Sequence, residues 1–196
     1  AEGEHEMQDF KFAISDSRKI ARSIAAFANK AGGRLLIGVK DNGNIAGIRT
    51  EEEFYMIEQA AEMYCKPAQK VESSVYSIEG RIVMKVDILK SKVPVYAQDE
   101  NHHWQAYIRV NDENIQVPRL LDLVWKRRQD DNSRIVYSDF EMRVLKALRQ
   151  TNNPEELFKL AHLSKQTVDH ILVELCSAGI ITFVYDNEQW TVQMAD

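Results

Sequence analysis

The pattern that most restricts the fold of this chain is a helix that passes into a buried strand through two glycines. Apolar residues at helical spacing predict a helix over 16–31, and Gly32 suits the left-handed position that often ends a helix. A nearly continuous apolar run then predicts a strand over 34–39. Because Gly32 and Gly33 leave almost no connection between the two elements, we expect close helix–strand packing.

Further elements extend this start into a mixed or antiparallel sheet with packed helices. The sequence predicts a turn at Asp41–Asn44 with a returning strand at 45–48, a helix from a capping box at Thr50 to about 64, a hairpin of 70–78 and 81–89, a strand at 105–110, and a helix from Pro118 to 128. Strands and helices that are interspersed in this way indicate an α+β fold.

The last third of the chain has a separate pattern. Residues 129–135 are polar and predict a linker. A capping box at Ser138 then opens the first of three predicted helices, and a hairpin follows the third. Three helices and a hairpin are the winged-helix arrangement. We therefore expect one domain over 1–128 and a small winged helix-turn-helix domain over 136–196.

Composition limits the classes of function. The net charge is −5, and residues 136–196 contain five Lys and Arg against nine Asp and Glu. Nucleic-acid-binding proteins usually carry a basic surface, so any such surface here must be local. No apolar run is long enough to span a membrane, and no signal-peptide pattern opens the chain. The two distant cysteines lack a zinc-binding spacing and fit buried thiols in a reducing cytoplasm.

Several motifs, in order, resemble the Schlafen/AlbA-like family of nucleic-acid-binding domains. They are Asp9-Phe-Lys11, Ala26-Phe-Ala-Asn29, Gly32-Gly33, Gly38-Val-Lys-Asp-Asn-Gly43 and Tyr107-Ile-Arg-Val110. The glycines at 32, 33, 38 and 43 are the turn-forming residues of these motifs. The chain departs from the family pattern at three positions, where Asp9 replaces Glu, Lys40 replaces Asp and Asn111 replaces Gly.

The resemblance implies a bacterial, transcriptional-regulator-like protein that binds nucleic acid, DNA rather than RNA, as a homodimer. In this hypothesis the side chains that contact phosphates are Lys11, Arg34, Arg109, Lys126, Arg127 and Arg128. The third helix of the winged domain would enter a major groove with its first residues leading. Its exposed candidates are Lys165, Gln166, Thr167 and His170.

The resemblance also implies an enzymatic alternative, a metal-dependent ribonuclease of the Schlafen type. The family's three carboxylates fall at Glu4, Asp9 and Asp41, with Glu6 as a substitute. Clustered carboxylates are suitable ligands for Mg²⁺ or Mn²⁺, which would be required only under this alternative. A third hypothesis is a protein-interaction module without nucleic-acid activity. No ATP is expected, because the chain contains no phosphate-binding loop motif.

Overall fold

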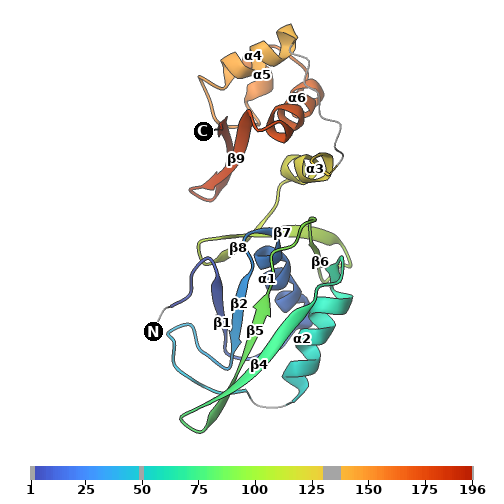
Figure 1. Ribbon diagram of the computed structural model, residues 1–196. Coiled ribbons are helices and arrows are strands. Elements are labelled where there is room, and N and C mark those ends of the chain that lie inside the picture. The colour runs from blue at the N-terminus through green and yellow to red at the C-terminus, as the bar shows by residue number, and fades with distance from the viewer. Residues whose placement is uncertain (1–2, 49–50, 130–137, 196) are drawn as a thin grey trace. The chain divides into compact units, whose positions relative to one another are not determined.

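The structure, a computed structural model, describes residues 3–48, 51–129 and 138–195. The chain divides between Val117 and Pro118 into two compact units (Figure 1). This division precedes the predicted boundary at 128, because helix α3 (Arg119–Arg127) packs against helix α6 (Lys165–Ser177) of the second unit. Apart from Gln129, the predicted linker lies outside the described residues.

The first unit contains a four-stranded sheet in the order β1-β2-β5-β4. Its strands are β1 (Gln8–Lys11), β2 (Gly33–Ile37), β5 (Arg81–Ile88) and β4 (Val71–Ile78). β1 runs parallel to β2, and the other pairs are antiparallel. A parallel pair requires a crossover, which helix α1 (Ser17–Asn29) supplies. The predicted α+β class is confirmed.

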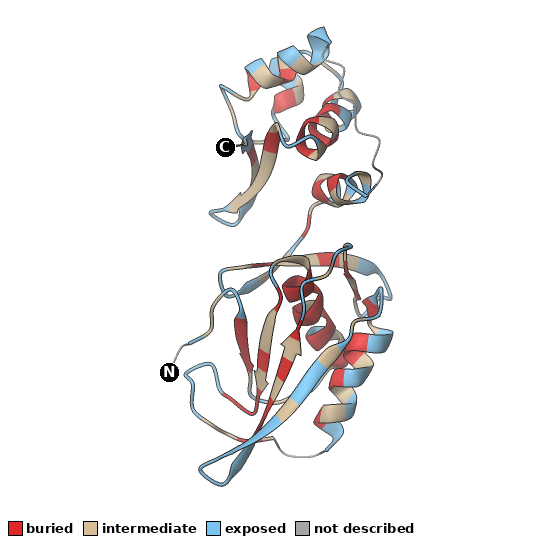
Figure 2. Ribbon diagram, in the orientation of Figure 1, coloured by how far each residue is buried: buried red, intermediate tan, exposed pale blue. Residues whose placement is uncertain are grey.

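Helix α1 forms the centre of the core. Nine of its thirteen residues are buried, so it is covered on most of its circumference (Figure 2). It packs against the first sheet, against helix α2 (Glu52–Met63), and against a second sheet in the order β3-β6-β7-β8. The strands of that sheet are β3 (Cys65–Lys66), β6 (Tyr96–Gln98), β7 (Trp104–Val110) and β8 (Glu113–Gln116).

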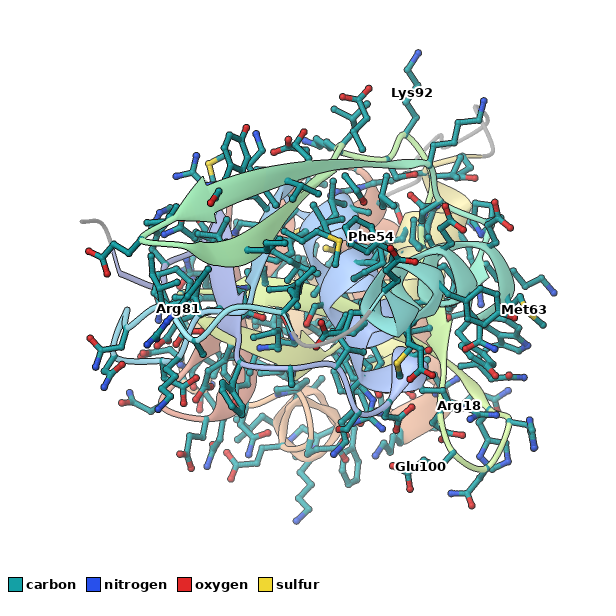
Figure 3. The ribbon with its side chains drawn as sticks, turned by 90° about the horizontal axis from the view of Figure 1, so that it is seen from below. Arg18, Phe54, Met63, Arg81, Lys92 and Glu100 are labelled. Atoms are coloured by element: carbon teal, nitrogen blue, oxygen red, sulfur yellow. The ribbon has the colours of Figure 1, made fainter. Side chains whose placement is uncertain are left out.

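The segment after β2 corrects one prediction. No strand forms at 45–48, where Val39 and Ile45 make a single bridge. Gly47 has a φ angle of +81°, which turns the chain so that the Ile48 amide donates to the Ile82 carbonyl at 2.8 Å. Arg81, labelled in Figure 3, also donates to the Ile45 carbonyl. The capping box at Thr50 lies outside the described residues.

Replacing Gly32 with alanine is expected to destabilise the fold more than replacing Gly43. Both glycines have φ angles near +80°, where a side chain costs about 1–2 kcal/mol. A Cβ atom on Gly32 would also lie 2.7 Å from the Ile88 carbonyl oxygen, whereas one on Gly43 would meet no atom within 4 Å. Urea unfolding of both variants measures the difference, and equal losses would contradict the packing argument.

The second unit begins with α3 and continues through three helices and a hairpin, in the predicted order. These are α4 (Asp139–Ala147), α5 (Leu157–Ala161), α6, and the pair β9 (Ile181–Asp186) and β10 (Gln189–Met194). The predicted capping box at Ser138 is present. No helix in the described part of the chain has the length and apolar character needed to cross a membrane.

Candidate nucleic-acid interface

Asp9 and Arg109 form a buried ion pair in the first unit. Asp9 lies on β1 and is 3% exposed, while Arg109 lies on β7 and is 1% exposed. Arg109 Nη2 is 3.5 Å from Asp9 Oδ1. A single charge in such a position costs several kcal/mol of desolvation, so each group helps to compensate the other. Lys11 Nζ, 2.6 Å from Asp9 Oδ2, is a second cation beside this carboxylate.

Arg109 makes three further contacts that connect β7 with β8, β1 and α1. Nη1 donates to Asn114 Oδ1 at 3.0 Å, and Nη2 donates to the Gln8 carbonyl at 3.4 Å. The guanidinium carbon also lies 4.9 Å from the centre of the Phe27 ring, within the range of a cation–π contact. This guanidinium does not reach the surface, which corrects the prediction that Arg109 contacts phosphate.

Glu4 lies beside Asp9 and has a raised pKa. The largest cause is burial, and the next is a hydrogen bond between the Glu4 and Asp9 carboxyl groups. Opposing these, Glu4 Oε1 accepts a hydrogen bond from the Phe10 amide at 2.9 Å. Two of the three predicted catalytic carboxyls therefore do come together, in a pair that favours protonation of Glu4.

Replacing Glu4 with glutamine is expected to change how stability depends on pH. Because folding raises the pKa of Glu4, its protonated form stabilises the fold below its ordinary pKa of 4.5. This contribution is lost as pH rises through the higher folded-state pKa. Glutamine cannot ionise, so the stability of Glu4→Gln relative to wild type should increase from pH 4.5 towards neutrality. Urea unfolding across this range, with Glu72→Gln as the exposed control, tests the prediction; parallel curves for wild type and Glu4→Gln would refute it.

Asp41 lies on the opposite face of the first sheet from Asp9. It lines a hollow together with Gln8 and Phe10, and the side chain of Asp9 points the other way because strand residues alternate. Glu6, the proposed substitute, lies 3.1 Å from Lys30 Nζ. Within residues 3–48, 51–129 and 138–195, no group of three or more His, Cys, Asp or Glu residues could hold a metal ion. The three-carboxylate site is not assembled.

The hollow has a volume of about 660 Å³ and an apolar floor that includes Phe10 and Leu36. Arg34 and Lys85 line it from neighbouring strands. Arg34 Nε donates to Gln8 Oε1 at 2.6 Å, and a hydrogen bond to Asp87 raises the pKa of Lys85. These two cations can meet an anion at the sheet face.

Lys11, the remaining predicted phosphate contact of the first unit, does not line the hollow. Its Nζ lies 2.6 Å from Asp9 Oδ2 and donates to the Phe10 carbonyl at 3.0 Å. Lys11 therefore faces the Asp9 side of β1, away from Arg34. Lys11 and Arg34 therefore do not form one basic surface.

A groove of about 750 Å³ lies between α3 and α6 in the second unit. It gathers five of the residues predicted to bind nucleic acid: Lys126, Arg127, Lys165, Gln166 and His170. Arg119 also lines it and was missed by the sequence analysis. Its position seven residues before Lys126 was the available signal, because residues at this spacing share a helix face.

Each cation of the groove has an acidic neighbour. Arg119 Nη2 lies 2.7 Å from Asp169 Oδ2, and Arg127 Nη2 lies 2.6 Å from Glu174 Oε1. Lys126 pairs with Asp122, and Lys165 pairs with Glu155. A bound phosphate must therefore compete with carboxylates, which makes its attraction modest and sensitive to salt.

Two other predicted residues do not line the groove. The Thr167 amide donates to Ser164 Oγ at 3.0 Å, so this residue belongs to the N-terminal cap of α6. Arg128 Nη2 donates to the Cys176 carbonyl at 2.6 Å, a hydrogen bond that connects the end of α3 to α6. Both residues make structural contacts, and their predicted nucleic-acid contacts stay predictions.

Comparison with known families and structures gives matches for both parts of the chain. A family model described as Schlafen, AlbA_2 matches residues 4–118. The DIP2311 protein of Corynebacterium diphtheriae aligns over 95% of this chain and 34% of its own, with 19% identity and a TM-score of 0.50. This chain thus spans about a third of that protein, and the likeness concerns the fold alone.

A second solved structure is the N-terminal domain of a Nitrosomonas europaea protein named as related to the ATP-dependent DNA helicase RecG. It aligns over 57% of this chain and 82% of its own, with 19% identity and a TM-score of 0.38. No curated protein matched the chain.

Proposed function

This chain belongs to the Schlafen, AlbA_2 family, and from that premise we propose that it binds nucleic acid. The observation that carries the proposal is the groove between α3 and α6. Four cationic side chains and Gln166 line it, although they lie on two helices far apart in the sequence. A groove with several cations suits a phosphate backbone.

We propose that the second unit acts as a winged helix and approaches duplex DNA with the first turn of α6. Val173 and Cys176 are buried and Asp169 pairs with Arg119 of α3, so this stripe of α6 faces α3 and is not available to a base. Lys165, Gln166 and His170 are exposed at the start of the helix. Glutamine can pair with adenine, and lysine can contact guanine or phosphate. The wide major groove of DNA admits a helix, whereas that of duplex RNA does not.

The wider role that we propose is that of a transcriptional-regulator-like protein in the bacterial cytoplasm. Such proteins commonly act as homodimers, because two copies read paired half-sites. Binding of this kind requires neither ATP nor a metal ion. The ribonuclease alternative is less well supported, because Asp41 lies on the other side of the sheet from Glu4 and Asp9.

A fluorescence-anisotropy titration tests the function. Duplex DNA, single-stranded DNA and structured RNA are titrated with the full chain at several salt concentrations, with and without Mn²⁺, and each endpoint is run on a gel. We expect intact duplex to bind most tightly, with log affinity falling linearly against log salt. Mn²⁺-dependent shortening of RNA would favour the ribonuclease instead. No binding at low salt would favour the protein-interaction module.

A further inference from the structure

Strand β4 ends the first sheet, and no strand in the part of the chain that the structure describes pairs with its outer edge. β5 is its neighbour in the sheet order β1-β2-β5-β4. Its residues from Ser73 to Ser77 are exposed except for Ser74, which is half-buried. Val75 and Tyr76 are 51% and 48% exposed. In Figure 1, β4 is the outer strand on the side of the sheet away from β1.

The hairpin turn determines which backbone groups face outward. Glu79 and Gly80 have φ angles of 52° and 74°, the two positive values of a type I′ turn. Ile78 and Arg81, which flank this two-residue turn, therefore form a hydrogen-bonded pair, and such pairs alternate along the ladder. It follows that the amides and carbonyls of Ser73, Val75 and Ser77 point away from β5.

An independent contact supports this assignment of the outward-pointing backbone groups. Ile82 lies opposite Ser77, so its backbone should point away from β4. The Ile82 carbonyl does accept a hydrogen bond from the Ile48 amide, on the far side of β5. Among the described residues, β4 makes no backbone hydrogen bond outside its ladder with β5.

Natural edge strands are usually blocked by proline, lysine or a bulge, and β4 has none of these. Its open stretch is symmetric about Val75, with Ser73 and Ser77 at equal distances on either side. An antiparallel copy of the same strand would therefore match each outward donor with an acceptor. We propose that two copies of this chain pair edge to edge through β4, with the two-fold axis at Val75.

The side chains fit this pairing. On one face Val75 meets Val75 of the second copy, and Ser73 meets Ser77. On the other face Tyr76 meets Ser74, and Glu72, the only charged residue of the strand, meets Ile78. No like charges oppose each other, and exposed apolar surface is covered. The paired strands bury less than the ~1,600 Å² of a typical stable interface, so the dimer should be reversible and depend on concentration.

A proline substitution at Val75 tests the β4 pairing by comparison with the wild type. Proline lacks an amide hydrogen, and at Val75 only the outward bond is lost, so Val75→Pro should leave the β4–β5 ladder intact. Sedimentation velocity should show a mass that rises towards two chains for the wild type and stays at one chain for Val75→Pro. A wild type that stays monomeric at every concentration, or a Val75→Pro variant that dimerises equally, would overturn the proposal.

Cysteine crosslinking tests the register and does not depend on a proline variant. Cys65 and Cys176 are the only native cysteines; both are buried, and burial raises the pKa of Cys65 to about 12. A thiol at position 75 would face its copy at a distance that a disulfide can span. We expect Val75→Cys to form a covalent dimer under mild oxidation. Ser77→Cys should not, because its copy would lie about four residues, roughly 13 Å, along the partner strand.

This inference concerns the homodimer alone and uses no nucleic acid in its tests. If the chain is a monomer that binds DNA, the β4 pairing is overturned and the groove proposal stands. If the chain is a dimer that binds no nucleic acid, the groove proposal is overturned and the β4 pairing stands.

Discussion

Replacing Arg109 with alanine is expected to lower the free energy of unfolding by about 3–5 kcal/mol. The change removes the buried one of two cations beside a carboxylate that is 3% exposed, and it leaves Asp9 with only the partly exposed Lys11 beside it. It also removes the bonds to Asn114 and the Gln8 carbonyl, which hold β7 to its neighbours. Urea unfolding followed by circular dichroism measures the loss.

A second pair of variants separates the ion pair from general packing. Lys70 is exposed in the same unit, so Lys70→Ala should change stability by no more than about 0.5 kcal/mol. Replacing both partners, as in Asp9→Leu with Arg109→Met, removes both buried charges and should recover part of the loss. If Arg109→Ala is as mild as Lys70→Ala, the pair does not have the structural role assigned to it.

Removing two groove lysines is expected to weaken DNA binding and flatten its salt dependence. Lys126 and Lys165 line the groove from α3 and α6. Each lysine that contacts a phosphate contributes about 1 to the slope of log affinity against log salt. The double variant Lys126→Gln, Lys165→Gln should therefore lose about 2 from that slope, measured by anisotropy on duplex DNA.

A control with the same change in charge distinguishes the groove from net charge. Lys146 and Lys159 are exposed in the second unit and do not line the groove. The double variant Lys146→Gln, Lys159→Gln should keep the wild-type slope. Conversely, Asp169→Asn removes a carboxylate that competes for Arg119 and should strengthen binding. Equal loss of slope in both lysine variants would place the DNA elsewhere.

Local patterns predicted much of the fold. The helical spacing over 16–31 gave α1, and Glu79-Gly80 gave the turn between β4 and β5. β1 has only four residues and opens with polar side chains, so periodicity offered too little signal to identify it. Its pairing depends on contacts with β2, which a local pattern cannot contain. The division before α3 was not predicted for a similar reason, because the apolar face of α3 does not reveal which helix covers it.

The candidate site was predicted less completely, because a motif names residues without stating their faces. Asp9 and Asp41 belong to the same resemblance, yet Asp9 points to one side of β1 while Asp41, in the turn after β2, lines the hollow on the other side. Arg109 was predicted as a phosphate contact because it lies in the Tyr107–Val110 motif of the family resemblance. Its burial follows from Asp9, about a hundred residues away in the sequence. Five residues of the groove were predicted individually to bind nucleic acid, but their common surface was not predicted. Only packing brings α3 and α6 together.

The separation between β1 and Arg109 has a consequence for the order of events during synthesis. The contact between Arg109 and Gln8 spans 101 positions. At translation rates of about 5–20 residues per second, Asp9 emerges roughly 5–20 s before the guanidinium that compensates it. For that interval the partly exposed Lys11 is the cation beside this carboxylate, so β1 should reach its fully buried position in the sheet only after β7 has been made.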